Sequence, residues 1–309
     1  MIDPDIFAPW VSGEARAAHA EPFPSPPPEA GIAALRTHYD AFNRAMLDKA
    51  LKAYAVDIVE GERGGVRVHT VSPSGGASDS RVLICLHGGA FMWGAGAGAL
   101  LEAAPLAATM GCAVVAVDYR LAPEHTFPAA VDDVVAVYRD LLESHAAASI
   151  GIFGCSAGGV LTAQAVAAML RAALPLPGAI AMLHGTGLEF AGDSAMTAGA
   201  FDTRSEARPA PTAEQLPYFA TADLREPAAM PGGHPATLAQ FPPSMLVSGT
   251  RDFAASACAT MHRRLLAAGV EARFVLFDGM WHAHHMNVEL PESRETFALL
   301  GRYFAEHLR

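Results

Sequence analysis

Continuous apolar runs recur along the chain and limit what it can fold into. They cover residues 82–86, 113–117, 150–153, 179–183 and 245–248, with helical or loop segments between them. Uninterrupted apolar strands are typical of a sheet that is covered on both faces, whereas half-exposed strands alternate apolar and polar residues. Strand alternating with helix therefore predicts an α/β fold with a mostly parallel, doubly wound central sheet. In such a sheet, ligands bind at the carboxyl ends of the strands.

Before the first of these runs, apolar residues recur with other spacings. From Glu29 to about Tyr54, apolar residues recur every three or four positions, which predicts one helical face that needs a surface to cover. Residues 56–60 and 66–71 flank glycines and predict an antiparallel pair of strands. Residues 1–28 end in a proline-rich run that excludes regular structure, which predicts an arm or a lid hinge.

The segment between the last two apolar runs has no regular strand pattern. It is rich in Gly, Pro and Ala, with short amphipathic pieces such as Thr212–Thr221. Because a connection this long is usually functional, we interpret it as part of a cap over the site. We therefore divide the chain into four segments. Residues 1–54 form an N-terminal arm and cap helix, and residues 55–184 form the first part of a catalytic α/β domain. Residues 185–240 form a cap insertion, and residues 241–309 form the second part of the catalytic domain.

Composition restricts the partners of this 309-residue chain. A formal net charge of −11 disfavours a nucleic-acid or anionic-membrane surface, so we expect a small-molecule partner, no nucleic acid and no membrane insertion. No basic, apolar leader is visible, and a cytoplasmic protein is predicted. A homodimer is left open. The four cysteines show no paired spacing, which favours buried free thiols.

A serine in a glycine turn is the first candidate catalytic residue. An apolar strand runs into Gly154-Cys155-Ser156-Ala157-Gly158 and continues into the apolar helix 160–170. Such a strand-turn-helix lifts the serine oxygen above the sheet, beside a helix N-terminus. His87-Gly88-Gly89-Ala90-Phe91 follows the strand 81–86, and its N–H groups, with that of Ala157, are candidate donors to an oxyanion.

A serine nucleophile needs a histidine base and a carboxylate that follow it in the chain. Asp252 lies in a loop after one predicted strand and His282 in a loop after the next. His284 and His285 are rivals for the base, and Asp278 is the rival acid. Three histidines within four positions also suggest a metal site, but the loop adds only Asp278 as a further ligand, so no metal and no cofactor are expected.

Several motifs in order resemble the hormone-sensitive-lipase-like bacterial carboxylesterases (family IV), a branch of the α/β-hydrolase superfamily. They include the glycine loop, the turn around Ser156, Gly279-Met280-x-His282 and the signature Asp118-Tyr119-Arg120-Leu121-Ala122-Pro123-Glu124. The chain departs from the family at Cys155, where Asp or Thr is usual, at Ala90, where a third glycine is common, and at His282-Ala283-His284.

The resemblance implies an α/β-hydrolase fold with a helical cap, Ser156 as nucleophile, Asp252 as acid and His282 as base. It also implies Gly88, Gly89 and Ala157 at the oxyanion hole, and a structural role for Tyr119, Arg120 and Glu124.

The predicted function is hydrolysis of short- to medium-chain carboxylic esters through an acyl-enzyme. Small residues at 94–98, near Phe91 and Trp93, suggest an apolar pocket of modest size. A lactonase or amidase remains an alternative, because the same three residues serve each leaving group. A further alternative is a binding protein on this scaffold, as in the plant gibberellin receptors, which lack a working triad.

Overall fold

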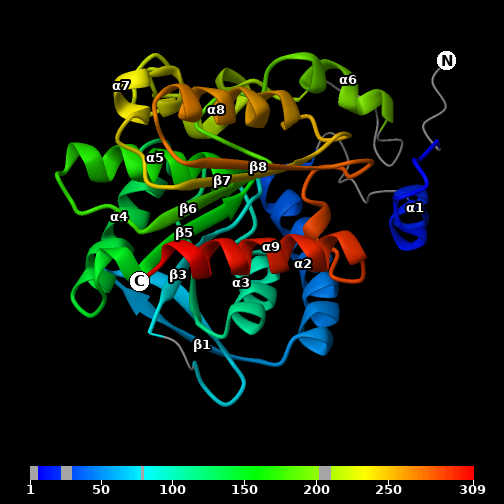
Figure 1. The fold of residues 1–309 in the computed structure, drawn as a ribbon, viewed down its shortest axis with the longest axis horizontal. Helices are drawn as coiled ribbons and strands as arrows, with labels where there is room; N and C mark the ends of the chain where they lie inside the picture. Colours follow the sequence, from blue (N-terminus) through cyan, green and yellow to red (C-terminus); the bar gives the residue numbers. More distant parts are fainter. Residues whose placement is uncertain (1–5, 22–29, 78–79, 202–209) are drawn as a thin grey trace.

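One mixed sheet organises the described part of the chain. The computed structural model describes residues 6–21, 30–77, 80–201 and 210–309. Within them, eight strands lie in the order β1-β2-β4-β3-β5-β6-β7-β8 (Figure 1). Their bounds are β1 Val56–Arg63, β2 Val66–Pro73, β3 Val82–Leu86, β4 Ala113–Val117, β5 Ile150–Cys155, β6 Ala179–Leu183, β7 Ser244–Gly249 and β8 Ala272–Phe277.

The strand directions follow the sequence pattern. The β1–β2 and β2–β4 pairs are antiparallel, and every later pairing is parallel. All residues of β3, β5, β6 and β7 are buried, as the continuous apolar runs predict. The predicted α/β fold with a mostly parallel sheet and flanking helices is confirmed.

Helices cover both faces of the sheet. Alternate residues of β3 and β5 pack into two different apolar cores, one shared with α4, α5 and α8 and the other with α3 and α9. The helices are α1 Gly13–Ala20, α2 Ile32–Ala53, α3 Ala97–Met110, α4 Ala129–Leu142, α5 Ala157–Arg171, α6 Asp193–Phe201, α7 Pro235–Leu238, α8 Ala255–Ala267 and α9 Pro291–His307. The side chain of Cys155 belongs to the core shared with α3 and α9.

Helices α1, α2 and α6 lie where the parallel strands end. In Figure 1, α1, α2 and α6 lie on the right, the side toward which these strands run. The predicted helix from Glu29 to about Tyr54 is confirmed as α2, and Thr212–Thr221 forms two 3₁₀ turns, Ala213–Gln215 and Pro217–Phe219. The proline-rich run of residues 22–28 lies outside the described residues.

The N-terminal arm contains a helix that its sequence does not predict. Helix α1 has eight residues, and the side chain of Ser12 accepts a hydrogen bond from the N–H of Ala15 at its start. Ser12 also donates to the carboxylate of Glu292 through its N–H (2.8 Å) and its hydroxyl (2.9 Å). Because so short a helix is marginal alone, these contacts with the start of α9 stabilise it.

All four cysteines are free and buried, as predicted. Among the described residues, no helix combines the length and the apolar character needed to cross a bilayer.

Candidate active site

Ser156 occupies a sharp turn between β5 and α5. Its backbone has φ 56° and ψ −117°, an unusual conformation for a residue with a side chain. The flanking glycines are required by close packing: a Cβ on Gly158 would lie 1.7 Å from the carbonyl oxygen of Leu86, and one on Gly154 would lie 2.4 Å from it. The turn therefore holds Ser156 at the carboxyl end of the sheet, beside the N-terminus of α5.

Asp252 follows β7 and is fully buried. Its Oδ1 accepts hydrogen bonds from Nδ1 of His282 (2.8 Å) and from the N–H of Ala254 (2.9 Å). Its Oδ2 accepts from Nδ1 of His184 (2.7 Å) and from the hydroxyl of Ser248. Both oxygens are thus saturated by donors, which fixes the orientation of the carboxylate.

His282 follows β8 and is the histidine of its loop whose side chain stays partly exposed. Its side chain is 22% exposed, its ring stacks on Phe253 at 4.1 Å, and both His282 and Ser156 line the same cavity. The rival bases His284 and His285 are fully buried, and their rings contact Thr296 and Glu102, respectively. The structure therefore joins His282 to Asp252 and places His282 and Ser156 on the wall of one cavity.

The rival acid Asp278 lies elsewhere. Its carboxylate accepts hydrogen bonds from Nε1 of Trp10 (2.9 Å) and from the hydroxyl of Thr250 (3.2 Å). These contacts tie the N-terminal arm and the loop after β7 to the loop after β8. The carboxylate that contacts His282 is that of Asp252.

The glycine loop after β3 packs against the serine turn. A Cβ on Gly88 would lie 3.4 Å from the Cβ of Ser156, and one on Gly89, where φ is +112°, would lie 2.1 Å from the carbonyl oxygen of Trp93. Ala90 adopts φ +51°, so the residue that replaces a glycine here still takes a left-handed conformation. Because Gly88 and Gly89 line the cavity of Ser156, their N–H groups are close to the reaction space.

The signature after β4 holds this loop in place. Tyr119 donates a hydrogen bond to the carbonyl oxygen of His87 (2.7 Å), and Asp118 accepts one from the N–H of Gly96 (2.8 Å). Glu124 forms a two-pronged ion pair with Arg36 of α2 (2.7 and 2.6 Å), and Arg36 lowers the pKa of Glu124 to about 2. Contacts of this kind fit the structural role that the resemblance implies.

Burial and charge set the protonation of the buried groups. Burial opposes ionisation of Asp252, but His282 and His184 lie against it and together hold its pKa well below the usual range. Burial lowers the pKa of His184 to about 4, although Asp252 opposes the shift. Burial raises the pKa of the Cys155 thiol well above its usual value, so this neighbour of Ser156 stays protonated at neutral pH.

Two cavities of unequal size meet at Ser156. The larger has a volume of about 900 Å³ and extends to Tyr39, Phe42 and Met46 of α2. It is larger than the modest pocket that the small residues at 94–98 predict, because α2 stands over the loop and forms a separate wall. The smaller has a volume of about 70 Å³ and an apolar wall that includes Val160, Leu216, Phe219 and Met230.

Sequence reasoning missed His184, which lies directly after β6 and contacts Asp252. It also missed Glu102, a fully buried acid in α3 whose Oε1 lies 2.9 Å from Nε2 of His285. A signal for each was present, since His184 ends an apolar strand and Glu102 interrupts an apolar helix. The fully buried His184, His284 and His285 form a group that could hold a metal ion, and we call it the histidine cluster.

Comparison with known proteins identifies the family. A family profile described as "alpha/beta hydrolase fold" matches residues 83–286, about two thirds of the chain. The chain belongs to the α/β-hydrolase family. An acetyl-hydrolase of Streptomyces hygroscopicus is 32% identical over 232 residues, which cover 73% of this chain and 75% of that protein.

Solved structures of other family members superpose closely. The crystal structure of esterase E25 has a TM-score of 0.83 and 28% identity, and the match covers 100% of this chain and 98% of that one. An esterase of the bacterial hormone-sensitive lipase family has a TM-score of 0.81 and 28% identity, with 92% and 94% covered. The resemblance to that group is confirmed, and the prediction of a carboxylic ester hydrolase is confirmed at the level of enzyme class.

Proposed function

We propose that this chain is a serine carboxylesterase that hydrolyses short-chain esters through an acyl-enzyme. Ser156 is the nucleophile, His282 the general base, and Asp252 the acid that orients His282. The observation that carries the proposal is the 2.8 Å hydrogen bond from Nδ1 of His282 to Asp252, with His282 and Ser156 on the wall of one cavity. A hydrogen bond at Nδ1 leaves Nε2 free to accept a proton, which is the tautomer that a general base needs.

In the first step, Nε2 of His282 takes the proton of the Ser156 hydroxyl while Oγ attacks the ester carbonyl carbon. The negative charge moves to the carbonyl oxygen, where the N–H groups of Gly88, Gly89 and Ala157 stabilise it. The Ala157 N–H opens α5 and has no acceptor within its helix, so it is available for this task. When the intermediate collapses, the alcohol leaves with the proton held by His282.

In the second step, His282 removes a proton from water, the hydroxide attacks the acyl carbon, and Ser156 leaves with the proton returned by His282. Asp252 stays ionised throughout, because its low pKa keeps it a carboxylate that stabilises the transient imidazolium. Stacking of the His282 ring on Phe253 restricts its rotation and supports the same geometry.

The unequal cavities support a short acyl chain. A volume of about 70 Å³ is roughly the space of two water molecules, which suits an acyl group of about two to four carbons. The larger cavity, beneath α2, then receives the alcohol and tolerates greater bulk. In this arrangement, α2 lines the larger cavity, and Leu188, Leu216 and Met230, from the connection between β6 and β7, line the smaller, so these parts act as the cap.

A panel of p-nitrophenyl esters from acetate to decanoate, with a lactone and an anilide, tests both parts of the proposal. We expect kcat/KM to be highest for acetate or butyrate and to fall steeply for longer chains. Ser156→Ala should lose activity by at least about 1,000-fold and should no longer react with a fluorophosphonate probe. Ser144→Ala is the matched control, because Ser144 also contacts a histidine, at 2.9 Å, but lies outside the site.

Three results would overturn parts of the proposal. Full activity in Ser156→Ala would show that Ser156 is not the nucleophile. A lactone hydrolysed in preference to every ester would show that the proposed substrate class is wrong. A wild-type chain that neither hydrolyses the panel nor reacts with the probe is a binding protein on this scaffold.

A further inference from the structure

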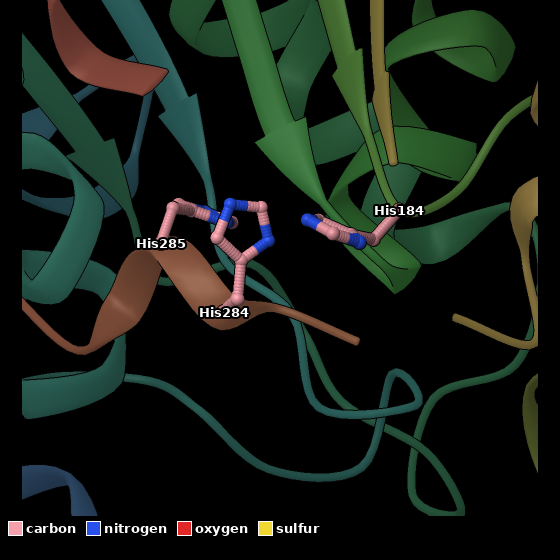
Figure 2. Close-up of side chains that lie close together, drawn as sticks. All are labelled: His184, His284 and His285. Carbon is pink, nitrogen blue, oxygen red and sulfur yellow. The ribbon is translucent and has the colours of Figure 1, made fainter. Parts of the chain in front are cut away.

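The histidine cluster lies in the interior, next to the proposed acid. His184 follows β6, while His284 and His285 belong to the 3₁₀ turn His284–Met286 after β8, and all three are 0% exposed. Figure 2 shows the three side chains close together, and their ring centroids lie 5.2–5.9 Å from one another. One ring nitrogen from each lies within 4.8 Å of the other two. The rings of His184 and His285 are nearly parallel, and that of His284 is close to perpendicular to both.

Each ring is held by one nitrogen and has no partner at the other. Nδ1 of His184 contacts Asp252 (2.7 Å), Nε2 of His285 contacts Glu102 (2.9 Å), and Nε2 of His284 contacts the hydroxyl of Thr296 (3.3 Å). The remaining nitrogens, Nε2 of His184 and Nδ1 of His284 and of His285, are buried without a hydrogen-bond partner. Unpaired buried polar atoms are rare in proteins, so three of them together require an explanation.

A metal ion held between the three rings would explain the arrangement. Histidines that bind a metal donate their second N–H to a carboxylate, carbonyl or other acceptor, which fixes the tautomer and the ring orientation. Two rings of the cluster contact buried carboxylates and the third contacts a hydroxyl, so all three already have the outer partners of metal ligands. The unpartnered nitrogens are then the ligand atoms.

The charge balance of the interior favours a cation at this place. Asp252 and Glu102 are both 0% exposed, and none of the ion pairs among the described residues joins either of them to a lysine or an arginine. Two carboxylates in an apolar interior are costly without a compensating charge. A divalent ion bound by the three neutral imidazoles would lie one ring away from each carboxylate and would offset both.

We propose that His184, His284 and His285 form a binding site for a divalent transition-metal ion of the Zn²⁺ type. Three imidazoles are ligands that Zn²⁺, Co²⁺ and Ni²⁺ share, and they disfavour Mg²⁺ and Ca²⁺, which prefer oxygen. Tetrahedral Zn–N bonds of about 2.1 Å place ligand nitrogens about 3.4 Å from one another, so nitrogens that now lie within 4.8 Å would approach by at most about 1.4 Å on binding. His284 also lines the large cavity, which is the side from which an ion would enter.

The site would join two strand ends through the interior. It ties His184, after β6, to the turn that begins two residues beyond His282, and His184 in turn holds Asp252. The ion is therefore a structural brace beneath the proposed acid and base, and it takes no part in bond making. This inference goes beyond the proposed function and does not depend on it, because its test measures binding and stability.

The experiment uses the full chain, dialysed against a chelator and then titrated with Zn²⁺ and Co²⁺. The wild type should bind one equivalent, show the visible absorption of tetrahedral Co²⁺, and gain roughly 5 °C in melting temperature at about 100 times the Kd. His284→Phe should bind at least about 100-fold more weakly and lose the temperature shift, while keeping the packing of the site. His125→Ala, an exposed histidine far from the cluster, is the matched control and should behave as the wild type.

His284→Phe also separates the proposal from an apolar defect in packing. If the cluster binds no metal, phenylalanine at position 284 replaces a buried ring nitrogen that has no hydrogen-bond partner. The variant would then melt at or above the melting temperature of the wild type under all conditions. With a metal site, the wild type melts higher than His284→Phe only when metal is present, and chelation removes the difference. Absence of one-equivalent binding to the wild type, or equal binding to His284→Phe, would overturn the proposal.

Discussion

Gly89→Ala is the substitution for which the structure gives the sharpest expectation. A Cβ at this position would lie 2.1 Å from the carbonyl oxygen of Trp93, a backbone atom that no side-chain rotation can move. The loop must therefore shift by about 1 Å, and a misplacement of that size typically costs about 100-fold in rate. Loss of one oxyanion donor costs about 100- to 1,000-fold, so both estimates agree, at roughly 3–4 kcal/mol of transition-state stabilisation.

The assay compares kcat/KM for p-nitrophenyl acetate between wild type and variant, with the melting temperature measured in parallel. Gly65→Ala is the matched control: its φ of +78° gives alanine a similar backbone cost, but a Cβ there meets no atom within 4 Å. We expect Gly89→Ala to lose 100- to 1,000-fold with its fold intact, and Gly65→Ala to stay within about twofold of wild type. A folded Gly89→Ala enzyme within threefold of wild type would refute the assignment of the Gly89 N–H to the oxyanion.

Three further predictions follow from buried and cap contacts. In the metal-free chain, burial lowers the pKa of His184 to about 4 from an ordinary 6.5, so the unfolded chain binds more protons between those two pH values. The stability of the chelator-treated chain should therefore fall by about 3 kcal/mol as the pH drops from 7 to 4, and calorimetry showing a flat melting temperature would contradict this. Met230 lies between the small cavity and a neighbouring one of about 450 Å³, so Met230→Ala should open the first cavity into the second. The ratio of kcat/KM for octanoate to kcat/KM for acetate should then rise, and an unchanged ratio would count against the small cavity as the acyl pocket. Arg36→Met removes hydrogen bonds to Glu124 and to the carbonyl oxygens of Met92 and Ala122. The variant should raise KM severalfold with little change in kcat, and steady-state kinetics with a change in kcat alone would argue against a role of Arg36 in holding the cap.

Local patterns in the chain were enough to predict the scaffold and the order of the candidate residues. Continuous apolar runs predict strands buried on both faces, and all of β3, β5, β6 and β7 are buried. Because carboxyl ends of parallel strands meet at one edge, Ser156, Asp252 and His282 could be expected together from their positions after β5, β7 and β8. The glycine turn carries its own constraint, since a side chain at Gly158 would collide with β3.

Long-range contacts decided what the sequence left open. Helix α1 depends on Glu292, which follows it by 280 residues, so no local pattern could predict its stability. Likewise, Asp252 is separated by 68 residues from His184, and His285 by 183 from Glu102. From the sequence alone, the three histidines of one loop did not indicate a metal site. In the structure, the side chain of His282 stays partly exposed in the cavity, whereas His284 and His285 lie next to His184 in the interior. Periodicity reports which face of an element is buried, but only the strand order and the packing of α3 and α9 determine which polar groups meet there.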